Sequence, residues 1–275
     1  MKPVVQRMKI GIVGCGAIGS RIAQAVNADI KKYSYVSAIY DIDFKKSEQL
    51  AKRLRKKGLC KSSLKDLLKD SDLVIEAVNA ESTRDIIQSA LKLKKHVLAM
   101  SVGKLLNALD LFTLAQRQRR FLLIPSGAVA GLDAMKAAGL ENITRITLTT
   151  RKPLLGFAHL RYFQEKGFDV NQIKGETTIF EGDVATAVKI FPQNINVAAT
   201  IALASLAMER MVVRVITAPT YKSNSHEIEV IGDFGRMVTC TDNVVCPDNP
   251  KTRYLAVLSA IQTLKQFFSY VKIGT

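Results

Sequence analysis

The stretch GIVGCGAIGSRIA, residues 11–23, decides the fold prediction, because it places three glycines between an apolar run and the start of a helix. The apolar run predicts a buried strand, and the apolar residues after the glycines recur at helical spacing. In such a strand–turn–helix segment, Gly14 permits a tight turn and Gly16 lets the backbone approach a pyrophosphate. Gly19 lets the helix pack closely on the strand. The segment therefore predicts a dinucleotide-binding turn, although the glycines alone would also suit an ordinary tight turn.

The amino end of this helix is the expected phosphate site. Its first amides, at Ala17 and Ile18, have no partner within the helix and carry partial positive charge, which favours a phosphate there. Asp41 ends the second predicted strand, where a carboxylate can accept hydrogen bonds from ribose hydroxyls. Its charge opposes the 2′-phosphate of NADP, although Lys45 and Lys46 partly compensate. NAD is therefore favoured as the cofactor, and NADP stays open.

Two patterns of apolar residues divide the chain. Short apolar strands alternate with helices as far as residue 124, which predicts an α/β fold with a Rossmann-type, doubly wound parallel sheet. From about residue 142 the segments alternate apolar and polar residues, which predicts a second α+β domain of mostly antiparallel strands. We expect a dinucleotide-binding domain over 1–124 and a substrate-binding, catalytic and dimerisation domain over 125–246. Residues 247–275 should contain a long helix, opened by Pro250, that packs back on the first domain.

Composition narrows the class of protein. Lys and Arg number 40 against 24 Asp and Glu, a net charge of +16. The basic residues are scattered over amphipathic segments without interleaved aromatics, which indicates solvated helix faces and not a nucleic-acid surface. Attraction of anionic substrates is the milder consequence, and nucleic-acid binding stays a rival that a salt-dependent shift assay tests. With no apolar run near the roughly 20 residues of a membrane span and no signal-peptide pattern, we expect a cytoplasmic protein.

Four cysteines, at positions 15, 60, 240 and 246, form no CxxC pair. We therefore expect reduced thiols and no metal site. Cys15, inside the glycine turn, is expected to be a small residue that fits a crowded backbone. The alternative is an exposed thiol whose pKa is lowered by the helix amino end.

The second domain carries the candidates for catalysis and substrate binding. His226 stands where a polar turn enters a strand, so it is either a catalytic group or an ordinary strand-end histidine. Asn194 and Asn196 precede an apolar helix, where an asparagine is either an N-cap or an amide that faces the nicotinamide carboxamide. Arg151 and Lys152 end another predicted strand, and their charges suit a dicarboxylate.

Seven stretches in chain order resemble the L-aspartate dehydrogenase family. They are GCGAIG (14–19), MSVGKL (100–105), IPSGAVAGLDA (124–134), TTRKP (149–153), FEGDVATAVKIFPQNINVAA (180–199), NSHEIEV (224–230) and NPKT (249–252). The resemblance implies a dimeric, Rossmann-type, NAD(P)-dependent oxidoreductase that converts L-aspartate to iminoaspartate. The iminoaspartate would hydrolyse to oxaloacetate and ammonia or supply quinolinate and NAD synthesis.

The same resemblance suggests roles for single residues. His226 matches the catalytic histidine of the family, and Ala128 matches an alanine that lies against the cofactor. Asn196, with Asn194 as its rival, matches a cofactor-contacting asparagine, and Asn224 joins the candidates for substrate binding. A histidine with a pKa near neutrality would take the amine proton or activate water against the imine.

Two departures from the family pattern and three alternatives stay open. Arg253 stands where a small hydroxyl residue is expected, and residues 79–81 (NAE) replace a run of small residues that borders the cofactor. A different two-domain NAD(P)-dependent oxidoreductase would act on homoserine, a semialdehyde or a sugar. A regulator would bind NAD without catalysis, and a nucleic-acid binder would need neither cofactor nor substrate.

Overall fold

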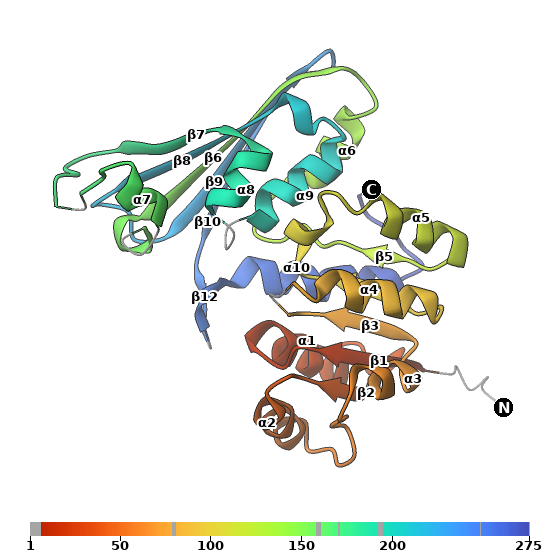
Figure 1. Cartoon of the computed structure of the whole chain (residues 1–275). Coiled ribbons are helices and arrows are strands. Elements are labelled where there is room, and N and C mark those ends of the chain that lie inside the picture. Colours follow the sequence, from red (N-terminus) through yellow and green to blue (C-terminus); the bar gives the residue numbers. More distant parts are fainter. Residues whose placement is uncertain are drawn as a thin grey trace. The chain divides into compact units, whose positions relative to one another are not determined.

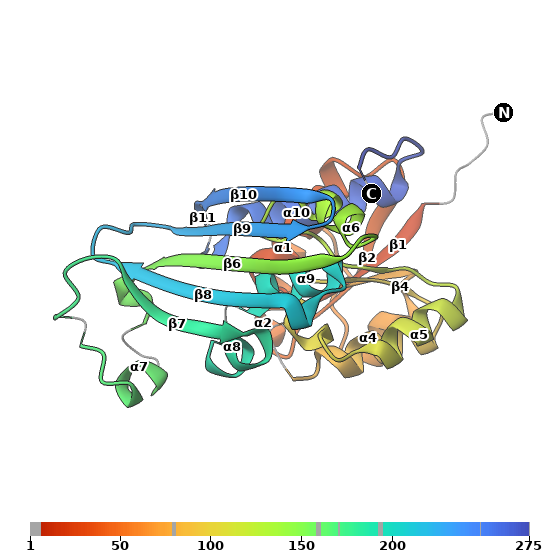
Figure 2. The same cartoon turned by 90° about the horizontal axis from the view of Figure 1, so that it is seen from above.

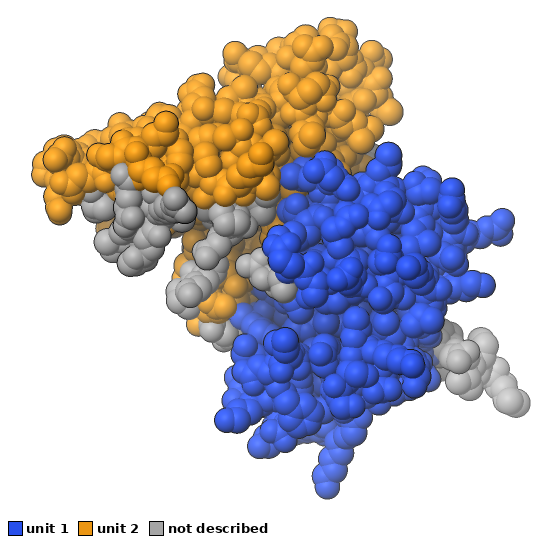
Figure 3. Space-filling model, in the orientation of Figure 1, with its two compact units in different colours: residues 1–125, 257–272 blue, residues 126–256, 273–275 orange. Residues whose placement is uncertain are grey.

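The computed structural model describes residues 7–78, 81–157, 161–169, 171–191, 195–247 and 249–274. The chain forms two compact units (Figure 3). The first unit contains Met1–Pro125 and Val257–Lys272, and the second contains Ser126–Ala256 and Ile273–Thr275. The glycine turn belongs to the first unit and His226 to the second.

The first unit is built on a parallel sheet of five strands in the order β2-β1-β3-β4-β5 (Figure 1). The strands are β1 (Met8–Val13), β2 (Ser34–Tyr40), β3 (Leu73–Glu76), β4 (His96–Ala99) and β5 (Leu122–Leu123). The helices are α1 (Ala17–Ala28), α2 (Phe44–Leu54), α3 (Leu64–Lys69), α4 (Thr83–Lys92), α5 (Leu109–Gln118) and α10 (Tyr254–Phe268), with a 3₁₀ turn at Val102–Leu105. The predicted Rossmann-type sheet is confirmed. Strand order reverses between β1 and β3, and ligands of such sheets bind at this switch point, beyond the carboxyl ends of the strands.

Alternate residues of the strands face helices on opposite sides of this sheet. On one face, Ile10 and Ile12 of β1 pack in a core with α1, α2 and the α10 residues Ala260 and Leu264. On the other face, a Cβ added to Gly11 would lie 2.8 Å from a methyl carbon of Leu67, so α3 packs directly on the β1 backbone. The sheet is therefore covered on both faces, as a doubly wound fold requires.

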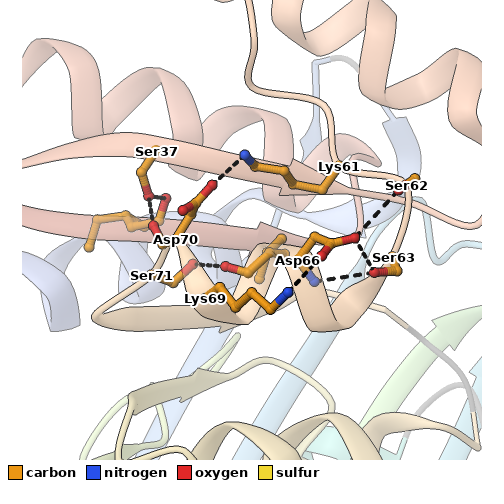
Figure 4. A network of polar contacts seen from close by, with 10 residues as sticks. Ser37, Lys61, Ser62, Ser63, Asp66, Lys69, Asp70 and Ser71 are labelled. Atoms are coloured by element: carbon orange, nitrogen blue, oxygen red, sulfur yellow. Dashed lines mark hydrogen bonds and ion pairs between the residues drawn. The ribbon is translucent and has the colours of Figure 1, made fainter.

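A network of serines and charged residues fixes α3 and the start of β3 (Figure 4). The Ser37 hydroxyl donates to the Asp70 carbonyl at 2.6 Å, and the Ser71 hydroxyl donates to the Leu67 carbonyl at 2.6 Å. Lys61 pairs with the Asp70 carboxylate. Because these groups satisfy one another at the end of a short helix, we interpret the network as structural.

The C-terminal helix starts later than its sequence predicts. Residues Asn249–Arg253 form strand β12, which pairs with β11 (Val245–Cys246), and α10 begins only at Tyr254. The prediction that Pro250 opens the helix is therefore wrong. Pairing with β11 satisfies backbone hydrogen-bonding groups of residues 249–253, so this segment forms a strand and not the first turn of the helix. Proline is tolerated in an edge strand, where the N–H that it lacks is not needed for pairing.

The second unit contains a mixed sheet of five strands in the order β10-β9-β6-β8-β7 (Figure 2). The strands are β6 (Ile143–Pro153), β7 (Thr177–Asp183), β8 (Met211–Ala218), β9 (Asn224–Gly232) and β10 (Gly235–Asn243). The helices are α6 (Leu132–Ala138), α7 (Arg161–Glu165), α8 (Val184–Ile190) and α9 (Ile195–Ser205), with 3₁₀ turns at Leu154–Gly156 and Met208–Arg210. Only β6 and β8 are parallel neighbours, which confirms the predicted mostly antiparallel sheet. The short helices α6 and α7 were not predicted.

One face of this second sheet changes from apolar to polar along its strands. Leu148 of β6 lies opposite Ile228 of β9, and two residues further along Thr150 lies opposite His226. Helices α8 and α9 line a small cavity over this face, together with Leu148, Thr150 and Lys152 of β6. The polar end of the face is the first feature of the second unit that suggests chemistry.

Among the described residues, no helix combines the length and apolar composition needed to cross a bilayer. The described part of the chain also contains no group of three or more His, Cys, Asp or Glu side chains that could hold a metal ion.

Candidate active site

The three glycines of the turn each meet a different environment. Gly14 has a φ of +95°, and a Cβ there would lie 2.5 Å from the Ala77 carbonyl oxygen. A Cβ on Gly19 would lie 1.9 Å from the Gly14 carbonyl oxygen. Around Gly16, by contrast, a Cβ would meet nothing within 4 Å. Gly14 and Gly19 are thus required by the fold, whereas Gly16 leaves open space at the backbone that a pyrophosphate would approach.

The amino end of α1 fits an anion. Gly16 is the N-cap residue and supplies no side-chain hydrogen bond, and the first turn of α1 contains no acidic residue. The Ser20 hydroxyl is directed to the Cys15 carbonyl at 3.0 Å and does not cap the helix either. The first amides of a helix have no partner within it, so those of Ala17 and Ile18 are suited to phosphate oxygens.

Asp41 connects the glycine turn to the end of β2. One carboxylate oxygen accepts from the Cys15 amide at 2.7 Å and the other from the Asp43 amide at 2.9 Å. Each oxygen keeps a lone pair that can accept from a ribose hydroxyl. Asp43 has a different task, because its side chain caps α2 through the Lys45 amide at 3.2 Å. This geometry fits the dinucleotide interpretation of Asp41.

Cys15 is a structural residue of the turn. Its side chain is buried, with Sγ 3.6 Å from the Ser47 hydroxyl oxygen. Burial raises the pKa of the Cys15 thiol to about 11, which disfavours the reactive thiolate. The expectation of a small residue in a crowded turn is confirmed, and the alternative of an exposed thiol with a lowered pKa is wrong.

Glu76, at the end of β3, was not predicted as a site residue. Its fully buried carboxylate accepts on one oxygen from the Val78 amide and the Thr83 hydroxyl, both at 3.1 Å. The other oxygen accepts from the Met100 amide at 3.2 Å and the Ser101 amide at 3.1 Å. Burial raises the pKa of Glu76, and the hydrogen bonds from Ser101, Thr83 and Val78 offset this rise only in part. Glu76 thus holds the segments that follow β3 and β4, and an acid within the apolar run LVIEAV was the signal that could have found it.

In the second unit, one ring nitrogen of His226 is held by the protein. The residue is 5% exposed, and Nδ1 lies 3.1 Å from the Thr150 hydroxyl oxygen. Thr150 thus occupies Nδ1, and Nε2 is the ring nitrogen that this hydrogen bond leaves for a ligand. This arrangement suits a catalytic imidazole.

Two cations act on this histidine. Burial lowers the pKa of Lys152 to about 7, with the charge of Arg253 as a second cause. Burial also lowers the pKa of His226 to about 4, with the charges of Lys152 and Arg253 contributing. Lys152, not His226, is thus the group with a pKa near neutrality, which corrects the expectation for the histidine. Burial and positive neighbours lower the pKa of both groups, so an anion bound beside them would raise both pKa values again.

Arg253 gains importance from this arrangement. The sequence marked it only as a departure from the family pattern at the start of the closing helix. In the structure it stands at the end of β12, close enough to influence the charge of both Lys152 and His226. Its own pKa is lowered by burial.

The two neighbouring cations of β6 lie on opposite faces. Successive side chains of a strand point to opposite sides, so Lys152 shares the face of Thr150 and Arg151 does not. Arg151 instead pairs with Glu227 at 3.2 Å. The structure therefore does not bring Arg151 together with His226. Asn224, buried and two residues before His226 on β9, does share its face.

The three candidates expected near the nicotinamide have different outcomes. The Ala128 carbonyl accepts from the Asn243 side-chain amide and the Thr241 hydroxyl, each at 3.0 Å, which places Ala128 beside the strand pair that carries His226. Asn196 is the second residue of α9 and is exposed, so it is not an N-cap. Asn194 lies outside the described residues.

Comparison with known proteins agrees with both halves of the chain. Residues 14–125 match the family model "Homoserine dehydrogenase, NAD binding domain", and residues 133–267 match "Aspartate dehydrogenase, C-terminal". Proteins named L-aspartate dehydrogenase from Methanosarcina barkeri and Methanosarcina mazei are each 42% identical to the chain, over 98% of its length and 100% of theirs. The chain belongs to the L-aspartate dehydrogenase family. It therefore contains a domain for a nicotinamide cofactor.

Solved structures support the fold of this family member. Aspartate dehydrogenase from Thermotoga maritima is 22% identical, with a TM-score of 0.71 over 98% of this chain and all of that one. A homoserine dehydrogenase from Thiobacillus denitrificans is 13% identical, with a TM-score of 0.60 over 94% of this chain and 72% of that one. At these identities the likeness is one of fold alone.

Proposed function

We propose that the chain is an L-aspartate dehydrogenase that oxidises L-aspartate to iminoaspartate, which hydrolyses to oxaloacetate and ammonia. The observation that carries this proposal is the group formed by His226, Lys152 and Arg253, in which an uncharged imidazole lies near two basic side chains. Such a cluster suits a dicarboxylate with one reacting amine. Whole-length identity of about 40% to proteins of that name supports the choice of substrate.

On the cofactor side, we propose that the α1 amino end and Gly16 receive the pyrophosphate and that Asp41 receives the adenosine ribose. The cofactor supplies the hydride acceptor when bound. The Asp41 charge supports NAD over NADP, because it opposes a 2′-phosphate. Glu76 would keep the neighbouring loop segments in place without touching the cofactor.

On the substrate side, Lys152 and Arg253 would bind carboxylates, with Asn224 as a polar neighbour on the same face. The reaction requires the amine to be uncharged, since its lone pair forms the C=N bond as hydride leaves Cα. Water then adds to the iminium carbon, and ammonia leaves to give oxaloacetate. At neutral pH, His226 takes part as an uncharged imidazole, because its pKa of about 4 lies well below.

Family membership also supports finer proposals. We propose that the enzyme is a homodimer, that it is cytoplasmic, and that iminoaspartate from this reaction supplies quinolinate and NAD synthesis. Sedimentation equilibrium of the purified chain tests the dimer directly.

The experiment that tests the proposed reaction follows NADH or NADPH formation with four substrates offered separately: L-aspartate, D-aspartate, L-glutamate and L-homoserine. We expect turnover with L-aspartate and faster turnover with NAD. Turnover of homoserine without aspartate would favour the other two-domain oxidoreductase. Binding of NAD without any turnover would favour a regulator.

A substitution at His226 tests the site itself. His226→Gln should lower kcat for L-aspartate roughly 100-fold or more, because a positioned acid–base or hydrogen-bonding group is lost. The affinity for NAD, measured by calorimetry, should stay within about 2-fold, since NAD is bound by the first unit. Turnover close to that of the wild type would remove His226 from the mechanism.

A further inference from the structure

Thr150 and His226 are partners across the sheet. Strands β6 and β9 run antiparallel with Thr150 opposite His226, so both side chains stand on the same face. Both residues are buried, at 6% and 5% exposure, and the Thr150 hydroxyl oxygen lies 3.1 Å from Nδ1. Neighbouring pairs of this ladder fix the two backbones, so the contact does not depend on a flexible loop.

The direction of this hydrogen bond follows from counting protons. Nδ1 is the single hydrogen-bond partner of the Thr150 hydroxyl in the described part of the chain. If the ring donated from Nδ1, the hydroxyl proton would be buried without an acceptor, at a cost of roughly 1–3 kcal/mol. The hydroxyl therefore donates and Nδ1 accepts. A neutral imidazole has one N–H, so its proton must then be on Nε2.

We propose that Thr150 is a positioning residue that keeps His226 in the tautomer with its proton on Nε2, so that the imidazole presents an N–H donor to the substrate. This inference rests on the proposed function for its catalytic meaning. Nε2 is the ring nitrogen that Thr150 does not occupy, and in this tautomer it has no lone pair for the ammonium proton. His226 thus binds a substrate carboxylate oxygen by donating, and the substrate ammonium releases its proton to solvent before hydride leaves Cα. The low pKa of His226 agrees, because the ring must be neutral for the two tautomers to differ.

Nitrogen NMR of the full-length chain labelled with ¹⁵N-histidine tests the tautomer directly, with and without NAD. The His226 signals are identified by their loss in His226→Gln. At neutral pH, we expect a protonated, pyrrole-type Nε2 and an unprotonated, pyridine-type Nδ1. A protonated Nδ1 in the wild type would overturn the proposal without any need for a Thr150 variant.

Matched variants of Thr150 test its catalytic role. Thr150→Val removes the hydroxyl at nearly constant shape, so kcat for L-aspartate should fall about 10- to 100-fold while KM stays within about 3-fold. The His226 signals should then show a mixture of tautomers. Thr150→Ser keeps the donor and should restore both the Nε2–H signal and kcat to within about 3-fold of the wild type.

The two proposals fail in different ways. A Thr150→Val enzyme with wild-type kcat and an unchanged tautomer would overturn the role of Thr150, even if aspartate is the substrate. If the wild type does not oxidise aspartate but Thr150→Val still mixes the tautomers, the proposed function fails and the role of Thr150 in setting the tautomer stands.

Discussion

The glycine turn of the first unit and the polar face of the second unit place functional groups by different means. The turn works through backbone, since Gly14 and Gly19 are required by contacts with carbonyl oxygens and Gly16 leaves open space. The polar face works through side chains that are far apart in sequence, such as Thr150 and His226. A site built from consecutive backbone has a local sequence signature, whereas a site built from cross-strand pairs has none until the register is known.

The largest loss of stability is expected from a substitution in the backbone of the glycine turn. Gly19→Ala should destabilise the first unit by about 3 kcal/mol or more, because its Cβ would lie within 2 Å of a backbone oxygen that cannot move alone. Gly16→Val should change the free energy of unfolding by less than about 1 kcal/mol, yet weaken NAD binding at least 10-fold. Urea unfolding and calorimetry separate the two outcomes. Full NAD affinity in Gly16→Val would mean that the pyrophosphate does not approach this backbone.

The second prediction concerns how the burial of His226 makes the stability of the protein depend on pH, and in which direction. The folded-state pKa is about 4 and the ordinary value is 6.5, so the unfolded chain binds this proton more readily. The stability linked to His226 is therefore present above pH 6.5 and is lost as pH falls towards 4, by about 3 kcal/mol in total. In His226→Gln, the free energy of unfolding should fall less steeply across that window than in the wild type.

Urea titrations at intervals of half a pH unit provide the measurement and its control. Between pH 7 and 8, where His226 is neutral in both folded and unfolded chains, the two proteins should keep a constant difference in stability. Parallel curves below pH 6.5 as well would show that the imidazole is not buried as the structure describes.

Sequence reasoning predicted the first unit well because its rules act over short distances. The turn, the parallel sheet and Asp41 at the end of β2 all follow from strands and glycines in one segment. For the second unit, the strands and their mostly antiparallel pairing were predicted, and His226 and Lys152 were named. The sequence could not predict which side chains share a face of the second sheet. The pairing of Thr150 with His226 depends on the register of β6 and β9. The position of Arg253 depends on the unexpected strand at Asn249–Arg253.

Binding of a dicarboxylate that has no amine tests whether Lys152, on the face of Thr150 and His226, contacts a substrate carboxylate. Binding of succinate at pH 7.5 should draw in protons, because a bound carboxylate raises the pKa of Lys152 from about 7. Calorimetry in two buffers of different ionisation enthalpy measures the uptake. Lys152→Met should abolish most of it and weaken succinate binding about 10-fold. The matched control, Arg151→Met on the opposite face, should change neither quantity, and a large effect there would reverse the assignment of faces.

The last test concerns Cys15, which the sequence predicts to be a small residue in the crowded glycine turn. With a pKa of about 11, this buried thiol has little thiolate at pH 8, whereas Cys240 is exposed. Iodoacetamide should therefore modify Cys15 at least 100-fold more slowly than Cys240, as peptide mass spectrometry would measure. Added NAD should leave the Cys240 rate unchanged. Rapid modification of Cys15 would mean that the turn opens to solvent, and the claim that this region works through rigid backbone would then fail, because a turn that opens cannot hold its amides in place for a pyrophosphate.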